Sequence, residues 1–157
     1  MKLKPDQEQQ AVTLMKSLKL FAGCTDVQLK AVAARMETQL FTKNKVLIME
    51  QEISKTLYVL LQGAVGIWRR TQGEKKLVAT LRAPEFFGEA SMFSESPANA
   101  LVKAEEDGQV FTLARGSFDE LAAADTTLGL LVEKNMQEIE TQRPPLIKRP
   151  SEEENPA

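Results

Sequence analysis

The chain has 157 residues, of which 43% are hydrophobic and 27% charged, and its formal net charge is −2. This length fits one domain of ordinary size, and the near-neutral charge provides no general attraction to nucleic acid or to an acidic membrane. The chain has no histidine and a single cysteine, which excludes Ser-His-Asp triads, His-ligated metal sites and an internal disulfide. We therefore expect a protein that is not an enzyme and that holds no metal.

The N-terminal segment turns polar after Lys4, where a secretory signal would become apolar. The longest apolar region, Leu57 to Trp68, is interrupted by Gln62, Gly63 and Gly66 and is too short to cross a bilayer. These features predict a cytoplasmic protein without a membrane span.

Helical spacing of apolar residues predicts a helix between Asp6 and Phe21. After Gly23, the residues Thr25 and Gln28 form a capping box that starts a second helix. Cys24 and Leu29 flank this cap at the positions of a hydrophobic staple, so Cys24 is interpreted as a small buried residue and not as a reactive thiol.

Short apolar runs separated by polar breaks follow as far as residue 114, and they predict strands. The Gln62-Gly63 pair and the Thr71–Glu74 segment are interpreted as hairpin turns, and Arg69 and Arg70 as exposed arginines that snorkel from a strand end. Many short strands with closely spaced turns predict a mainly β protein, a β-sandwich jelly roll with flanking N- and C-terminal α-helices. The expected strands are Thr38–Phe41, Val46–Glu50, Leu57–Leu61, Ala64–Arg69, Lys76–Leu81, Leu101–Ala104 and Val110–Ala114.

Helical spacing returns at Ser117, a cap-like residue, and a last helix follows. Its apolar stripe is either an interface with a second copy or a partner protein, or an ordinary face packed on the sandwich; it consists of Leu128, Leu131, Val132 and Ile139. We expect one domain over residues 6–142. Residues 143–157, rich in proline and acidic residues, are predicted to form a disordered tail.

The segment from Phe86-Phe87-Gly88-Glu89 to Ala104 resembles the phosphate-binding cassette of cyclic nucleotide-binding domains, in which F-G-E opens a short helix and S/T-P-R-A/T-A follows. The run Leu57-Tyr58-Val59-Leu60-Leu61-Gln62-Gly63 is similar to the family's L-Y-x-I-x-x-G strand and turn. The resemblance covers residues 18–142 and implies the same jelly-roll fold. It implies the following candidates for the ligand pocket: Phe87, Gly88, Glu89, Ala90, Ser91, Pro97, Ala98, Asn99 and Ala100.

In that family, helix amides and an arginine hold the cyclic phosphate, and the glutamate accepts from the ribose 2′-hydroxyl. Here Ala98 stands at the arginine position and Asn99 follows it. The family's Q-G-E-x-G-D turn reads Glu50-Gln51-Glu52-Ile53-Ser54-Lys55, without either glycine. Glu89 is either a remaining ribose ligand or a first-turn acid that stabilises its helix.

We therefore predict a regulatory or protein–protein interaction module that has lost ordinary cyclic nucleotide binding and has another protein as its partner, with a homodimer through the last helix as one form. One alternative is a working sensor of cyclic AMP, cyclic GMP or another nucleotide, in which Arg82 or Lys103 replaces the missing arginine. A small jelly-roll enzyme is the second alternative, and the absence of histidine opposes it. No basic recognition helix for direct nucleic-acid binding is present in the sequence.

Overall fold

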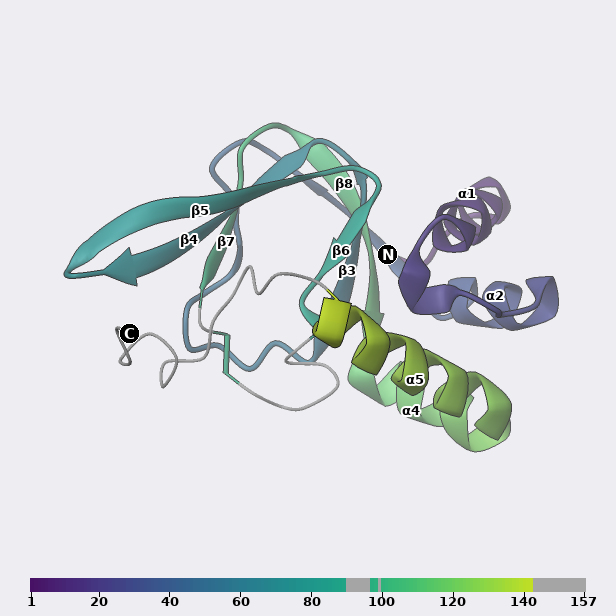
Figure 1. Cartoon of the computed structure of the whole chain (residues 1–157). Coiled ribbons are helices and arrows are strands. Elements are labelled where there is room, and N and C mark those ends of the chain that lie inside the picture. Colours follow the sequence, from purple (N-terminus) through teal and green to yellow (C-terminus); the bar gives the residue numbers. More distant parts are fainter. Residues whose placement is uncertain (90–96, 99, 143–157) are drawn as a thin grey trace.

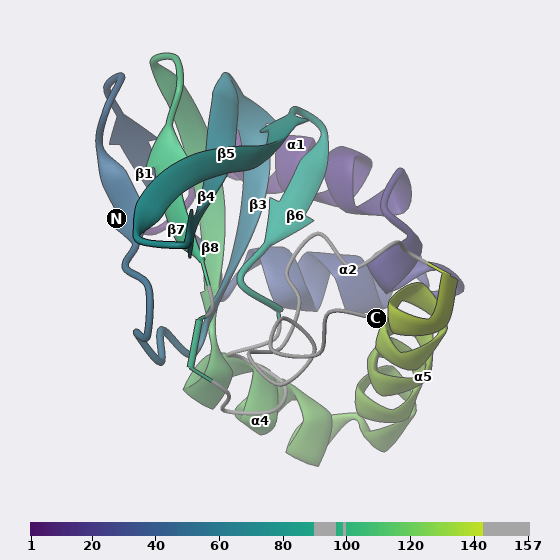
Figure 2. The same ribbon diagram turned by 60° about the vertical axis from the view of Figure 1, so that its left-hand side comes forward.

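Eight strands form two four-stranded antiparallel sheets in the computed structural model, which describes residues 1–89, 97, 98 and 100–142. One sheet has the order β1-β8-β3-β6 and the other β2-β7-β4-β5. The strands are β1 (Glu37–Phe41), β2 (Val46–Ile48), β3 (Thr56–Gln62), β4 (Ala64–Thr71), β5 (Glu74–Arg82), β6 (Glu85–Phe87), β7 (Leu101–Ala104) and β8 (Gly108–Ala114). The described helices lie on one side of this sandwich, against the sheet that contains β3, β6 and β8 (Figures 1 and 2). The predicted jelly roll with flanking helices is confirmed.

The two turns that the sequence indicated have different roles. β4 and β5 form a hairpin in which Thr71 pairs with Glu74, and Gln72 and Gly73 both have positive φ, as a tight hairpin turn requires. This hairpin projects from the sandwich (Figure 1). The expected hairpin at Gln62-Gly63 is wrong, because β3 and β4 belong to different sheets. Gly63, with φ +91°, carries the chain from one sheet to the other.

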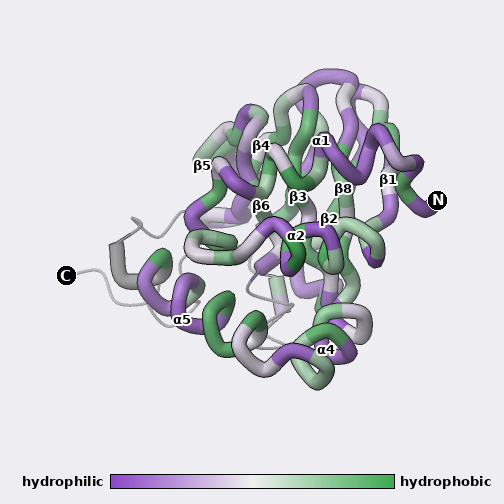
Figure 3. The backbone as a smooth tube through the Cα atoms, turned by 90° about the vertical axis from the view of Figure 1, so that its right-hand side faces the viewer, coloured by the Kyte–Doolittle hydropathy of each residue, from purple (hydrophilic) through white to green (hydrophobic). Residues whose placement is uncertain are grey.

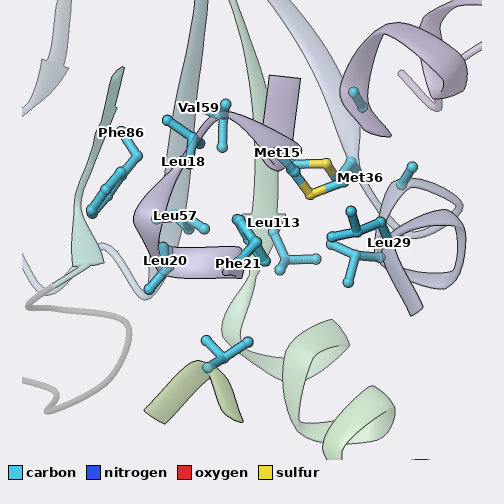
Figure 4. Packing of buried hydrophobic residues seen from close by; sticks show 14 of the residues in the cluster. Met15, Leu18, Leu20, Phe21, Leu29, Met36, Leu57, Val59, Phe86 and Leu113 are labelled. Carbon is cyan, nitrogen blue, oxygen red and sulfur yellow. The ribbon is translucent and has the colours of Figure 1, made fainter. Parts of the chain in front are cut away.

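The sheet β1-β8-β3-β6 separates two hydrophobic clusters. On β3, Leu57 and Val59 face the helices, whereas Tyr58 and Leu60 face the space between the two sheets. We call the first cluster the helix-side core and the second the interior core. Figure 4 shows the helix-side core, where residues of the N-terminal helices meet β3, β6 and β8.

The N-terminal region contains α1 (Pro5–Lys16), the 3-10 helix η1 (Lys19–Phe21) and α2 (Asp26–Ala33). The single helix expected up to Phe21 is therefore interrupted, since α1 ends at Lys16 and a tighter turn follows. The capping box is confirmed: Gln28 N–H donates to Thr25 Oγ1 at 3.1 Å and Thr25 N–H donates to Gln28 Oε1 at 2.9 Å. Cys24 is half-buried against the helix-side core, where burial raises the pKa of its thiol.

At the C-terminal side, β8 leads directly into α4 (Arg115–Ala124), which is followed by α5 (Thr126–Gln142). The helix expected from Ser117 begins two residues earlier, because the Arg115 N–H finds an acceptor in the Lys55 carbonyl at 2.9 Å and needs no side-chain cap. Helix α5 alternates between hydrophobic and hydrophilic stretches (Figure 3). Residues 143–157, the predicted tail, lie outside the described residues.

Two polar side chains attach the C-terminal helices to the N-terminal ones. Gln28 Nε2 donates to Asp125 Oδ2 at 3.1 Å. The side chain of Asn135, only 7% exposed, donates to the carbonyl oxygens of Leu20 and Ala22 at 3.0 and 2.9 Å. None of the described helices combines the length and the apolar character needed to cross a bilayer.

Candidate functional site

The candidate site begins where β6 ends, at Gly88. The rings of Tyr58 and Phe87 are stacked in the interior core with centroids 4.9 Å apart and planes 2° apart. Gly88 has φ +85°, and a Cβ atom there would lie 2.5 Å from the carbonyl oxygen of Thr56. The close approach of two backbone segments therefore requires glycine at this position.

Glu89 is half-buried and has helical backbone conformation. Ala90, Ser91 and Asn99, three of the predicted pocket residues, lie outside the described residues. Phe87 and Phe86 are both buried, but they point to opposite faces of the sheet, into the interior core and the helix-side core respectively. Phe86 therefore belongs to the support of the site rather than to the site itself.

The second part of the candidate site is the segment around Ala98, which packs against the same interior core as Phe87. Its backbone is fixed by two hydrogen bonds, one from Gln51 N–H to the Ala98 carbonyl at 2.6 Å and one from Ala98 N–H to the Glu52 carbonyl at 2.8 Å. The Ala98 side chain is half-buried and packs against the interior core, while Ala100 is 1% exposed in the same core and Pro97 is exposed. Position 98 therefore faces the inside of the sandwich.

The turn that holds Ala98 contains no glycine. Gln51, at the first position where the family has glycine, has φ 74°, a left-handed conformation that costs a non-glycine residue roughly 1–2 kcal/mol. The Glu52 side chain accepts a hydrogen bond from Met49 N–H at 2.9 Å across this turn. Burial and the carboxylate of Glu52 raise the pKa of Tyr58, so its phenol stays neutral at pH 7.

Arg82 and Lys103, the two cations that the sequence analysis considered as phosphate ligands, both have other partners. Arg82 lies on the surface and forms an ion pair with Glu106 at 3.0 Å. The ammonium group of Lys103 lies 4.8 Å from the centroid of the Trp68 ring. Val102 and Ala104 face the interior core, so Lys103 projects from the outer face of the same strand.

A residue that the sequence interpretation missed is Arg69. It was expected to snorkel into solvent, but it is 6% exposed, whereas Arg70 is exposed. Ile67 and Val65, two and four residues earlier on β4, face the interior core, and the strand alternation puts Arg69 on that same face. The signal was present in the alternation of β4, but a pair of adjacent arginines at a strand end concealed it.

The apolar stripe of the last helix packs inside the chain. Leu128, Val132 and Ile139 are buried in the helix-side core, and Leu131 lies against the backbone of Gly23. Of the two interpretations left open by the sequence, the structure therefore shows the packed face. Within the part of the chain that the structure describes, no cluster of carboxylate and thiol side chains could hold a metal ion.

The comparison with protein families matches residues 38–125, more than half of the chain, to the model described as the cyclic nucleotide-binding domain. The chain belongs to the cyclic nucleotide-binding domain family. Mouse cGMP-dependent protein kinase 2 is 28% identical over 117 residues, which are 68% of this chain and 15% of the kinase. The chain thus spans only a small part of this curated relative.

Solved structures show the same fold. A cyclic nucleotide-binding domain from Methylobacillus flagellatus has a TM-score of 0.79 and 20% identity, over 88% of this chain and 78% of that one. The regulatory subunit of a cAMP-independent protein kinase A from Trypanosoma brucei has a TM-score of 0.74 and 17% identity, over 88% and 48%. A triple mutant of that subunit, in which one substitution introduces an arginine, is bound to cAMP in its A site.

Proposed function

We propose that this cyclic nucleotide-binding domain is a non-enzymatic, cytoplasmic regulatory module that acts through a partner protein and does not recognise cyclic AMP or cyclic GMP in the ordinary way. The observation that carries the proposal is Ala98. Its methyl group occupies the inward-facing position where the family has an arginine, on a backbone fixed by the turn at Gln51 and Glu52.

The energetic consequence follows from the chemistry of the phosphate. A phosphate that enters the site must give up its hydration, and helix amides without a cation compensate for this only in part. Loss of one member of a buried, hydrogen-bonded charge pair costs about 2–5 kcal/mol, or roughly thirty-fold to several-thousand-fold in affinity. Arg82 and Lys103 do not support the alternative of an ordinary sensor, because their charged groups are held at the surface and on the outer face.

The Trypanosoma subunit supports the proposal by analogy. It belongs to a cAMP-independent kinase, and the mutant bound to cAMP carries an introduced arginine. The partner of the present chain is proposed to be another protein. The Leu128–Ile139 stripe is not proposed as its contact, because three of its four side chains are buried in the helix-side core.

Calorimetric titration with cyclic AMP and cyclic GMP tests this function. The wild type should show no binding at about 100 μM, and the double variant Ala98→Arg, Asn99→Ala should bind at least about tenfold more tightly. The control Ala98→Gln, Asn99→Ala has a long polar side chain without the charge and should show no binding of either cyclic nucleotide. Low-micromolar binding by the wild type would refute the proposal.

If neither the wild type nor the arginine variant binds a cyclic nucleotide, features of the site other than the arginine also prevent binding. The regulatory role would then have to be tested through the partner alone. Equal binding by the arginine and glutamine variants would show that the length of the side chain, and not its charge, limits the affinity.

A further inference from the structure

Strand β5 forms one edge of the sheet β2-β7-β4-β5. Its residues 74–78 are all exposed, and the β4–β5 hairpin projects beyond the other strands (Figure 1). Within the described part of the chain, no backbone hydrogen bond joins the outer side of β5 to another element. Such an edge presents a row of free N–H and C=O groups, to which a further strand can add.

The hairpin turn determines which backbone groups of β5 point outward. The closing pair, Thr71 and Glu74, flanks a two-residue loop and is therefore hydrogen-bonded. Opposite pairs along an antiparallel ladder alternate between those that exchange hydrogen bonds and those that do not. The pairs that contain Lys75 and Leu77, one and three positions further along β5, are of the second kind. Their N–H and C=O groups consequently point away from β4, to the open edge.

The side chains of Lys75 and Leu77 lie on the outer face of the sheet. Leu77 is opposite Trp68 on β4, and Trp68 is on the outer face because its neighbour Ile67 belongs to the interior core. Leu77 is 46% exposed and the adjacent Val78 is 45% exposed. An edge strand with exposed apolar residues in its middle is one that readily pairs with another chain.

The same part of the hairpin is basic, although the net charge of the whole chain is −2. Arg70, Lys75 and Lys76 are exposed, and no ion pair joins any of them to another described residue. Glu74 is the single acidic residue between positions 70 and 78. A second copy of β5 would bring lysines against lysines, which is unfavourable, whereas carboxylates beside this strand are attracted.

We propose that the outer edge of β5 binds an extended acidic segment of the partner protein, which adds to the sheet as an antiparallel strand. Hydrogen bonds to the backbone of Lys75 and Leu77 supply affinity, and the side chains beside them supply specificity. An apolar residue of the segment lies opposite Leu77, and the next two residues, both acidic, lie opposite Lys76 and Lys75. This inference rests on the proposed function, because it identifies the class of partner through which the module acts.

An NMR titration of the isotope-labelled full chain with the peptide acetyl-Thr-Thr-Val-Glu-Glu-Thr-Thr-amide tests the proposal. Trp68 is the single tryptophan of the chain, so its indole N–H gives one resonance, and its partner Leu77 is at the proposed contact. We expect saturable shifts of this resonance and of the Lys75 and Leu77 amides, with a Kd of about 1 mM or lower. The absence of saturable shifts on β5 at about 10 mM peptide overturns the proposal.

Two methylated peptides test whether the contact is strand pairing. In the proposed register the valine N–H donates to the Leu77 carbonyl, so methylation of the valine amide should weaken binding at least about tenfold. The amide of the first glutamate points away from β5, and its methylation is the matched control that should keep the affinity. Equal affinities of the two methylated peptides would contradict the added strand.

Two double variants of the chain test the charges. Lys75→Glu with Lys76→Glu places acids opposite acids and should weaken peptide binding at least about tenfold. Lys30→Glu with Lys134→Glu makes the same change in net charge at exposed positions of the helices and should keep the affinity. Equal weakening in both double variants means that the attraction is not local to β5 and overturns the proposal.

Two other occupants of the edge are separate outcomes. A dimer of the wild type in sedimentation that Lys75→Glu with Lys76→Glu alters would assign the edge to a second copy of the chain. Tighter peptide binding after deletion of residues 143–157 would assign it to the chain's own acidic run at positions 152–154. Either result overturns the assignment to a partner. The calorimetric titration with cyclic nucleotides does not involve β5, so it tests the proposed function independently of all these results.

Discussion

The side chain of Asn135 offers the sharpest test of how the last helix is held in place. It donates two hydrogen bonds from α5 to the Leu20 and Ala22 carbonyls and is 7% exposed. Asn135→Ala removes both bonds, each worth about 1 kcal/mol, and leaves the buried Leu20 carbonyl without this donor at a further 1–3 kcal/mol or so. We expect a loss of about 3–5 kcal/mol, equivalent to a fall in Tm of roughly 6–20 °C for a chain of this size.

Urea unfolding followed by tryptophan fluorescence measures this loss, with Gln137→Ala as the matched control. Gln137 lies on the same helix and is exposed, so its truncation should change the free energy of unfolding by less than about 0.5 kcal/mol. If Asn135→Ala also stays within about 0.5 kcal/mol of the wild type, the clamp does not stabilise the fold, and the docking of α5 depends on its apolar side chains alone.

Three further predictions concern other parts of the chain. Gly88→Ala should destabilise the fold by at least about 1 kcal/mol more than Gly73→Ala. Both glycines have positive φ, but only at Gly88 would the new Cβ meet a carbonyl oxygen. Equal losses of unfolding free energy in chemical denaturation would contradict this. Hydrogen bonds from Leu128 N–H and the Gln28 side chain lower the pKa of Asp125 below its ordinary value of 3.8, so it contributes stability above pH 4 that is lost as the pH falls through the lowered pKa, and Asp125→Asn should remove this part of the pH dependence. Deletion of residues 143–157 should leave the Tm within a few degrees, since their composition cannot offset the entropy of ordering them, and a larger drop would show that this segment docks on the domain.

Local sequence signals predicted the elements whose stability is itself local. The Thr25–Gln28 capping box depends on two hydrogen bonds within four residues, and the β4–β5 hairpin depends on the residues of its own turn. The three-residue strand β6 was not predicted, because it is too short to show an alternation and its pairing with β3 is long-range. The turn at Gly63 was assigned to a hairpin because a glycine turn looks the same whether the chain stays in one sheet or crosses to the other.

In the candidate site, too, local motifs could be read from the sequence, whereas features that depend on long-range pairing could not. The resemblance of Phe87-Gly88-Glu89 to the cassette indicated where the candidate site begins, and the order of residues from there to Pro97 and Ala98 placed position 98. The orientation of Lys103 could not be predicted, because a short strand of mixed residues does not reveal which face is buried until its partners are known. The alternation of β4 did indicate the burial of Arg69, but the adjacent Arg70 concealed it.

The alternation along β3 has a mechanical consequence. Its successive residues pack alternately in the two clusters, with Leu57 and Val59 in the helix-side core and Tyr58 and Leu60 in the interior core. A slip of one residue would exchange the contents of both clusters, so the strand cannot slide to accommodate a ligand. An event at the Tyr58–Phe87 stack can therefore reach the helices only as a tilt of the intact sheet or through the loops at its ends. The sheet acts as a stiff partition, and any signal that crosses this domain has to go around its edge or move it as one piece.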